Sequence, residues 1–210
     1  FPYYVLAERQ TSGRGRRGRS WVSPFGENLY YSLVVRVEGG MRQLEGMSLA
    51  VGLALLQVIR GFGVTEAGLK WPNDVLVGER KLAGILLELS GDPADVCNVV
   101  IGIGLNVNML AAEAGAIGQP WTSMRAELGR LLNRNELIAD LNQQLSHYLD
   151  IQLREGFTAL RDEWQACHLW QGRSVALTAG GEPIEGDVLG VDHYGAIRLR
   201  INELEQSFSG

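Results

Sequence analysis

Residues 13–19 read GRGRRGR and place four arginines among three glycines, in a chain whose formal net charge is -5. Arginine carries a planar set of N–H donors that matches carboxylate and phosphate oxygens. Glycine lets the backbone bring its own N–H groups against a ligand. The segment predicts a loop that folds over a small anion, and a basic surface loop or a nucleic-acid patch stays open as its alternative.

Three further segments combine polar residues with short strands: KWPND at residues 70–74, KLAGIL at 81–86 and GIGLNVN at 102–108. Behind Lys81, the small residues Ala83 and Gly84 leave room for a ligand against the backbone. Lys81 is also compatible with a solvated hairpin lysine. Asp74 suits either a magnesium ligand, a group that orients an amine, or an ordinary turn former.

The elements that must position these residues follow from hydrophobic periodicity and turn residues. The pattern predicts strands at residues 3–8, 29–37, 69–74 and 96–108, a hairpin of 75–77 with 81–89, and helices at 43–62, 135–155 and 157–164. From Arg173 onward, short strands alternate with turns, which is typical of a small antiparallel barrel. We therefore expect two domains, residues 1–168 and 169–210.

Composition narrows the class of protein. A chain of 210 residues with 46% hydrophobic and 20% charged residues can bury a good core. The sequence pI of about 5.3 argues against general nucleic-acid affinity. The apolar run at 49–59 is about half the ~20 residues of a membrane span. Without a signal peptide or a disulfide framework, Cys97 and Cys167 are expected to be small core residues of a cytoplasmic protein.

Taken together, GRGRRGRSW, KWPND, KLAGIL and GIGLNVN resemble the biotin protein ligases of the biotin-[acetyl-CoA-carboxylase] ligase type, which have a class II adenylating fold. The resemblance spans essentially the whole chain. It implies an α+β fold, in which a biotin/lipoate ligase catalytic domain with a mixed sheet and packed helices precedes a small SH3-like β-barrel. It also implies formation of biotinyl-5'-AMP from biotin and ATP, then transfer of biotin to a lysine of a biotin carboxyl carrier protein.

The resemblance assigns roles to individual residues of this chain. Biotin binding falls on Gln10, Arg14, Gly15, Arg16 and Lys81. Chemistry falls on Lys81, Arg16, Lys70 and Asp74, with Asp74 as the expected magnesium ligand. Contacts with ATP or the adenylate fall on Arg19, Trp21, Asn73, Gly84, Asn106 and Trp121, of which Trp121 equally suits a core position.

The physical reasoning agrees with this assignment. A carboxylate is already ionised at neutral pH, so adenylation needs no general base. The barrier is repulsion between anions, and cations and backbone N–H groups aimed at the reacting oxygens lower it. Magnesium would share the charge of the leaving pyrophosphate.

Two departures from the family pattern are expected at the ends of the chain. The Ser-Thr segment that binds the biotin ureido group would precede Phe1, and the strand after an SGGE-like turn would follow Gly210. No helix-turn-helix is visible, so DNA binding is not assigned. We also expect self-association through a sheet edge at residues 95–99, because Asp95 and Asn98 are polar among apolar neighbours.

Two other functions remain open. A lipoate ligase or octanoyltransferase shares the implied fold, although the arginine-dense loop is more typical of biotin ligases. A non-catalytic anion-binding or nucleic-acid-binding module would need a basic surface that extends beyond one loop, and it leaves KWPND and KLAGIL without a purpose.

Overall fold

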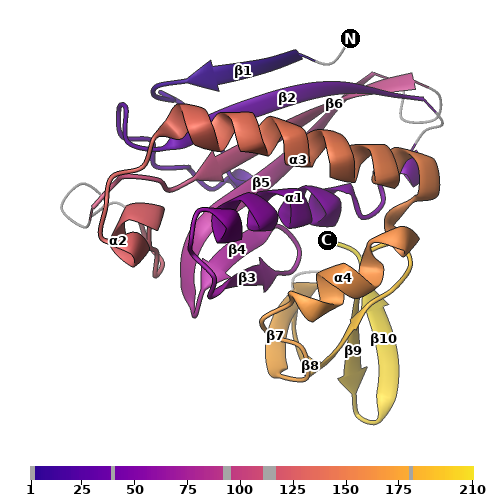
Figure 1. Cartoon of the computed structure of the whole chain (residues 1–210). Helices are drawn as coiled ribbons and strands as arrows, with labels where there is room; N and C mark the ends of the chain where they lie inside the picture. Colours follow the sequence, from indigo (N-terminus) through magenta and orange to yellow (C-terminus); the bar gives the residue numbers. More distant parts are fainter. Residues whose placement is uncertain (1–2, 39–40, 92–95, 111–116, 180–181) are drawn as a thin grey trace.

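A six-stranded sheet forms the centre of the protein in a computed structural model, which describes residues 3–38, 41–91, 96–110, 117–179 and 182–210 (Figure 1). The strand order is β1-β2-β6-β5-β4-β3, and each neighbouring pair is antiparallel. The strands are β1 (Tyr3–Ala7), β2 (Leu29–Glu38), β3 (Ala67–Lys70), β4 (Asp74–Val77), β5 (Arg80–Gly91) and β6 (Val96–Leu105). Within the described residues, parallel pairing is limited to two isolated bridges, Leu69 with His168 and Lys81 with Trp121.

Helices α1 (Met47–Gly61) and α3 (Arg134–Glu155) pack on each other and cover one face of this sheet (Figure 1). The helix predicted at 43–62 begins later than expected, after a 3-10 turn at Met41–Leu44. Gly46 separates the two with φ 75°, and a Cβ at this position would lie 2.4 Å from the Phe157 ring. The left-handed backbone and the close packing together explain the later start.

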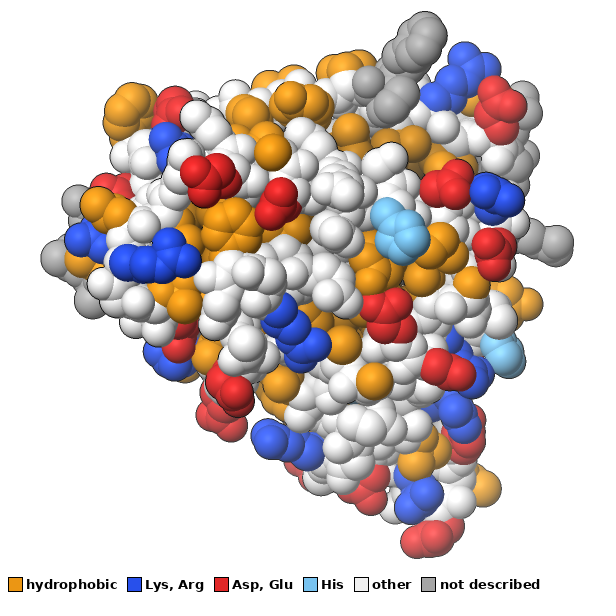
Figure 2. Space-filling model, viewed as in Figure 1, with side chains coloured by type: hydrophobic (Ala, Val, Ile, Leu, Met, Phe, Trp, Pro, Cys, Tyr) orange, Lys and Arg blue, Asp and Glu red, His pale blue; other side chains and the backbone are white. Residues whose placement is uncertain are grey.

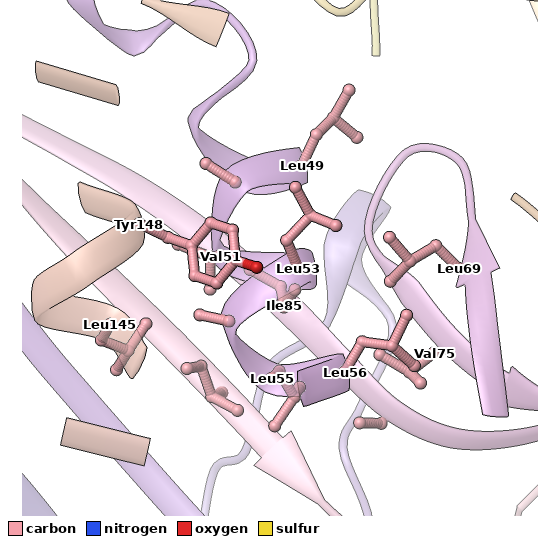
Figure 3. Packing of buried hydrophobic residues seen from close by; sticks show 14 of the residues in the cluster. Leu49, Val51, Leu53, Leu55, Leu56, Leu69, Val75, Ile85, Leu145 and Tyr148 are labelled. Atoms are coloured by element: carbon pink, nitrogen blue, oxygen red, sulfur yellow. The ribbon is translucent and has the colours of Figure 1, made fainter. Parts of the chain in front are cut away.

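The core lies between the helices and the sheet. Leu53, Leu55 and Leu56 of α1 are fully buried, and Figure 3 shows Leu53 and Leu56 on the side of the strands that carry Ile85 and Val75. Tyr31 of β2 also donates its hydroxyl hydrogen to Asn142 Oδ1 of α3, at 2.6 Å. Along β6 the odd-numbered residues from Cys97 to Leu105 are buried against the helices, so the even-numbered ones face the other way.

A second, four-stranded antiparallel sheet follows the short helical segments Phe157–Ala159 and α4 (Arg161–Ala166). Its order is β10-β9-β8-β7, formed by Ser174–Ala179 (β7), Glu182–Val191 (β8), Ile197–Ile201 (β9) and Leu204–Phe208 (β10). The last strand was not predicted. The SH3-like barrel and the domain boundary at residue 169 stay predictions.

The predicted sheet edge at 95–99 is wrong. Asp95 itself lies outside the described residues, but Cys97 pairs with Val37 of β2 on one side and with Gly91 of β5 on the other. β6 is therefore an interior strand, and β1 and β3 form the edges. Asn98 is polar because it lies on the face of the sheet that the helices leave open, and not because its strand is at an edge.

Figure 2 shows acidic and basic side chains interspersed over the face that α3 covers, without a large patch of one sign. Cys97 and Cys167 are both free thiols, Cys97 buried and Cys167 half-buried. No helix in the described part of the chain is long and apolar enough to cross a membrane.

Candidate active site

A cleft of about 940 Å³ opens on the face of the large sheet opposite to the helices. Its size falls in the range of pockets that hold a nucleotide-sized ligand. Of the thirteen predicted site residues, eleven line this cleft: Gln10, Arg14, Gly15, Arg16, Arg19, Trp21, Lys70, Asn73, Asp74, Lys81 and Gly84. Segments that are far apart in the sequence thus converge on one site.

An ion pair between Lys81 and Asp74 lies in the cleft. Lys81 Nζ is 2.7 Å from Asp74 Oδ1, and both side chains are more than four-fifths buried. Lys81 and Gly84 both line the cleft, although regular alternation along β5 would place these two residues on opposite faces of the sheet. The pairing of β4 with β5 shifts at this point, from Val75 with Ala83 to Leu76 with Lys81, which leaves Leu82 as the extra residue of a bulge. The bulge brings Lys81 onto the open face, a known effect of bulges near functional sites.

The arginine loop folds back on itself as a narrow hairpin. Gly15 N donates to Arg19 O at 2.6 Å, and Trp21 N donates to Gly13 O at 2.9 Å. At its tip, Arg17 has φ 56°, and its side chain donates to Thr178 O of β7. The loop therefore spans the cleft from the large sheet to the C-terminal sheet.

The arginines of this loop differ in their surroundings. Arg14 is largely exposed and pairs with Glu88 at 2.8 Å. Arg16 points inward and donates to Asn73 Oδ1 at 3.4 Å. Burial, then repulsion from Arg17, lowers the pKa of Arg16, and attraction to Asp74 opposes both effects. Arg16 is thus a charged donor that an anion in the cleft would stabilise.

Lys70 is another cation that lines the cleft. Its Nζ lies 4.3 Å from the centroid of the Trp170 ring. Burial lowers the pKa of Lys70, Asp74 raises it, and Lys81 and Arg19 lower it further. Several cations therefore share one electrostatic field in the cleft, which favours a polyanionic ligand.

Glycines on the floor of the cleft accommodate a side chain of the protein itself. Gly84 and Gly104 face each other across β5 and β6. A Cβ at Gly104 would lie 2.4 Å from Trp21 Cε2, and a Cβ at Gly84 would lie 3.1 Å from Trp21 Cζ3. The space predicted for a ligand beside Gly84 is thus taken by the indole, whereas Gly102 remains open toward the cleft.

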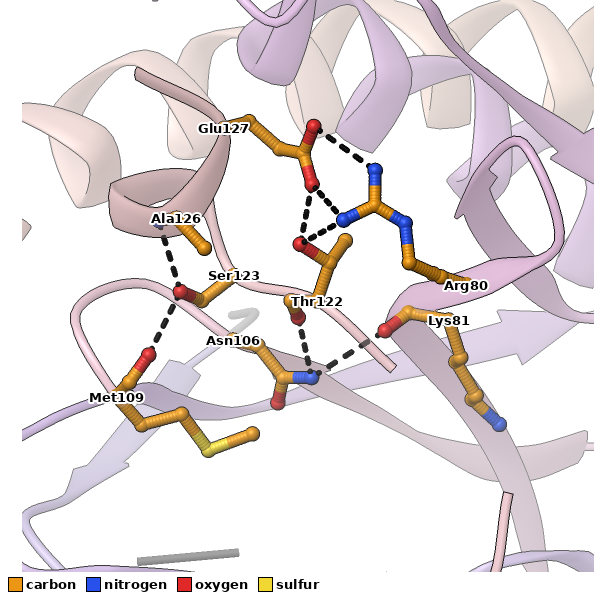
Figure 4. Close-up of polar contacts among 8 residues, drawn as sticks. All are labelled: Arg80, Lys81, Asn106, Met109, Thr122, Ser123, Ala126 and Glu127. Atoms are coloured by element: carbon orange, nitrogen blue, oxygen red, sulfur yellow. Dashed lines mark hydrogen bonds and ion pairs between the residues drawn. The ribbon is translucent and has the colours of Figure 1, made fainter. Parts of the chain in front are cut away.

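Asn106 and Trp121 are not among the described residues that line the cleft. Asn106 is 3% exposed, and its Nδ2 donates to Thr122 O at 3.0 Å and to Lys81 O at 3.5 Å (Figure 4). Trp121 forms a parallel bridge with Lys81. Both residues therefore support the backbone of Lys81, and their contacts with adenine stay predictions.

Sequence reasoning missed the wall that the C-terminal sheet and the segment before it contribute. His168, Trp170, Leu177 and Thr178 line the cleft, as do residues 207–210. Burial lowers the pKa of His168 to about 4, and its ring stacks on Trp164. The HLW sequence at 168–170, with two aromatic rings beside the expected domain boundary, was the available signal.

The fold and sequence match known proteins. Residues 2–106 match the Biotin/lipoate A/B protein ligase family. The chain is 38% identical over 205 residues to the bifunctional ligase/repressor BirA of Escherichia coli, covering 98% of this chain and 64% of that protein. It is 36% identical over 203 residues to the biotin–[acetyl-CoA-carboxylase] ligase of Paracoccus denitrificans, covering 94% of this chain and 83% of that protein.

Among solved structures, the biotin protein ligase from Aquifex aeolicus in complex with biotin and ATP superposes with a TM-score of 0.85 at 27% identity, covering 99% of this chain and 85% of that one. The chain spans only about three fifths of the length of the Escherichia coli and Salmonella typhimurium BirA proteins, 64% and 60% respectively.

Proposed function

Because the chain belongs to the biotin/lipoate A/B protein ligase family, we propose that it is a biotin protein ligase. It joins biotin to ATP to form biotinyl-5'-AMP and then transfers biotin to a lysine of a biotin carboxyl carrier protein. The proposal rests on one observation above all. The inward-facing Arg16, the Lys81–Asp74 pair and Lys70 line a single cleft large enough for an adenylate.

In the first step, a biotin carboxylate oxygen attacks the α-phosphorus of ATP, and the bond to pyrophosphate breaks. Arg16 and Lys81 are the proposed donors to the carboxylate and to the charge that develops on the phosphate. Asn73 is proposed to hold Arg16 in place, since it accepts from Arg16 Nη1 and donates to Ile85 O. Arg19 and Trp21 are the proposed adenylate contacts within the cleft, and Gly84 is proposed to contribute by accommodating the Trp21 indole.

In the second step, the neutral amine of the acceptor lysine attacks the acyl carbon, and AMP leaves as the acyl–phosphate bond breaks. We propose that Asp74 orients this amine, because it is an acid in the cleft and lies beside the cationic Lys81. The BirA and biotin–[acetyl-CoA-carboxylase] ligase names of the relatives support a carrier domain of acetyl-CoA carboxylase as the acceptor.

We propose that Mg²⁺ binds together with ATP. Asp74 and Glu88 are the acids among the described residues that line the cleft, and each already pairs with a base. The described residues also contain no cluster of three His, Cys, Asp or Glu side chains. A single carboxylate plus phosphate oxygens suits Mg²⁺, which would neutralise charge on the pyrophosphate, with Asp74 as its protein ligand.

The test is release of pyrophosphate with ATP, Mg²⁺ and either biotin or lipoate. Transfer to the acceptor is measured separately, as streptavidin binding of the carrier domain after incubation with biotin and ATP. Biotin-dependent release with labelling of the carrier supports the proposal. Release with lipoate instead would identify a lipoate ligase, and release with neither would leave only an anion-binding protein.

A homodimer and a cytoplasmic location are further parts of the proposal. Free thiols at Cys97 and Cys167 suit a reducing compartment. With β6 in the interior, a dimer must form through another surface. Sedimentation at tens of micromolar with and without biotin and ATP tests it, and a monomer under all conditions would refute it.

A further inference from the structure

The backbone of Lys81 is held by a segment far along the chain. Lys81 N donates to Pro120 O at 3.0 Å, and Lys81 O accepts from Thr122 N at 2.9 Å. Residues 120–122 thereby pair with the beginning of β5 on the side where Asn106 also donates to Lys81 O. Since Nζ extends from this backbone, the segment helps to set where the cation lies in the cleft.

Three side chains fasten that segment to Lys81's own strand. Arg80, the residue before Lys81, forms an ion pair with Glu127 of α2 (Met124–Leu128), with Nη1 and Oε1 2.9 Å apart and Nη2 and Oε2 3.2 Å apart. The Thr122 hydroxyl donates to Glu127 and accepts from Arg80 Nη1 at 3.3 Å. Figure 4 shows the three side chains converging behind Lys81. We call Arg80, Thr122 and Glu127 the polar clamp.

The clamp is built more firmly than an ordinary surface ion pair. Thr122 is 2% exposed and the Glu127 side chain 17% exposed, whereas the Arg80 side chain is 49% exposed, so solvent screens the contacts from the Arg80 side only. The hydrogen bond from Arg80 Nη2 to Glu127 Oε2 and the ion-pair contact between Nη1 and Oε1 together fix the relative orientation of the two groups. The neighbouring Ser123 caps α2 by accepting from Ala126 N and donates to Met109 O, which fixes the helix that carries Glu127.

The clamp does not contact the cleft directly. Among the described lining residues, Lys81 and Gln119 border the clamped region, and none of the three clamp residues lines the cleft. Any effect of the clamp on chemistry must therefore pass through Lys81 and through the segment at 117–121.

We propose that Arg80, Thr122 and Glu127 are positioning residues for adenylation, which hold Lys81 at the reacting oxygens and couple it to the segment at 117–121. This inference rests on the proposed function and deepens it. A misplacement of about 1 Å at a reacting group can cost up to about 100-fold in rate. Loss of the clamp is expected to lower kcat, because Lys81 then samples other positions.

The experiment compares Glu127→Ala with Glu127→Gln, and uses Glu66→Ala, an exposed acid before β3, as the matched control. Rates of biotin-dependent pyrophosphate release are measured in the full chain, together with KM for biotin and ATP. We expect kcat to fall about 10- to 100-fold in Glu127→Ala, less in Glu127→Gln, which keeps the shape, and not at all in the control.

A double-mutant cycle separates positioning from general stability. In a Lys81→Ala background, Glu127→Ala should change the rate by less than about 2-fold, because its effect passes through Lys81. Thr122→Ser keeps the hydroxyl and should retain the wild-type rate, whereas Thr122→Val should not. These conservative variants keep the test informative if Glu127→Ala folds poorly.

The outcomes are distinct. The proposal would be overturned if the wild type is active and Glu127→Ala leaves kcat unchanged. It would also be overturned if Glu127→Ala lowers the rate by the same factor in the wild type and in the Lys81→Ala background. A wild type that releases no pyrophosphate with biotin would refute the proposed function, and the inference with it.

Discussion

Replacing Gly104 with alanine tests whether Trp21 packs on the glycine floor of the cleft. A Cβ at Gly104 would lie 2.4 Å from Trp21 Cε2 and 2.5 Å from Cζ2. Ordinary contact begins near 3.4 Å, so the indole must retreat by about 1 Å. Gly102, two residues earlier on the same face of β6, is the matched control, because its Cβ would meet Leu86 at 3.5 Å or more.

The magnitude follows from two opposing effects. Overpacking costs about 1–3 kcal/mol. Alanine also reduces the conformational entropy of the unfolded chain, which stabilises the folded state by about 0.4–1 kcal/mol. Neither glycine has a positive φ, so alanine adds no backbone strain at either position. The net loss of about 0–2.6 kcal/mol corresponds to a Tm lower by up to roughly 10 °C, at about 2–4 °C per kcal/mol for a protein of this size. Gly102→Ala should leave Tm unchanged or raise it slightly.

Gly104→Ala should also lower the catalytic rate more than Gly102→Ala does. Lys81 Nζ lies 5.5 Å from the Trp21 ring centroid, so a displaced indole also disturbs the cation. We expect pyrophosphate release to slow about 10-fold in Gly104→Ala. Thermal melts and initial rates of both variants provide the readout. Equal Tm values for the Gly104→Ala and Gly102→Ala proteins would refute the packing argument.

Three further predictions concern the cations and His168. Lys81→Ala should cut adenylate formation by about 10² or more, whereas Arg16→Ala should in addition let biotinyl-AMP escape; equal rates and equal adenylate retention would contradict this. Trypsin cleavage within residues 13–21 should slow sharply with biotin and ATP, because the repelling arginines gain an anionic partner, and unchanged cleavage would mean a pre-formed loop. The pKa of His168 is about 4 when folded and 6.5 ordinarily, so the unfolded state binds the proton more readily, and stability is lost as pH falls from 6.5 toward 4. Melts in this window should fall less steeply in His168→Gln than in wild type or in the exposed-site variant His147→Gln, and parallel curves would contradict the assignment.

The elements and the chemistry of the site were accessible from sequence because both are encoded locally. Period-two and helical patterns predicted β2, the β4–β5 hairpin and α3 within about one or two residues. The arginine-glycine loop predicted an anion site through residue type alone, and eleven of the thirteen predicted site residues line one cleft.

What sequence reasoning lacked were relations between distant segments. Polar Asn98 suggested an edge, but strand order depends on pairing with β2 and β5, which lie some 60 residues before and just before it. The HLW segment at 168–170 offered two aromatic rings as a signal, but its place beside the cleft depends on docking between the sheets.

The tertiary structure also decided what the local signals meant. Gly84 predicted room for a ligand against the backbone, and only packing revealed that the Trp21 indole occupies this space. Lys81 had the right chemistry, but a bulge at Leu82 and backbone pairing with residues 120–122 determine which face of the sheet it occupies. The residue type determines the charge of a side chain, whereas backbone hydrogen bonds with distant residues determine the direction in which the side chain points.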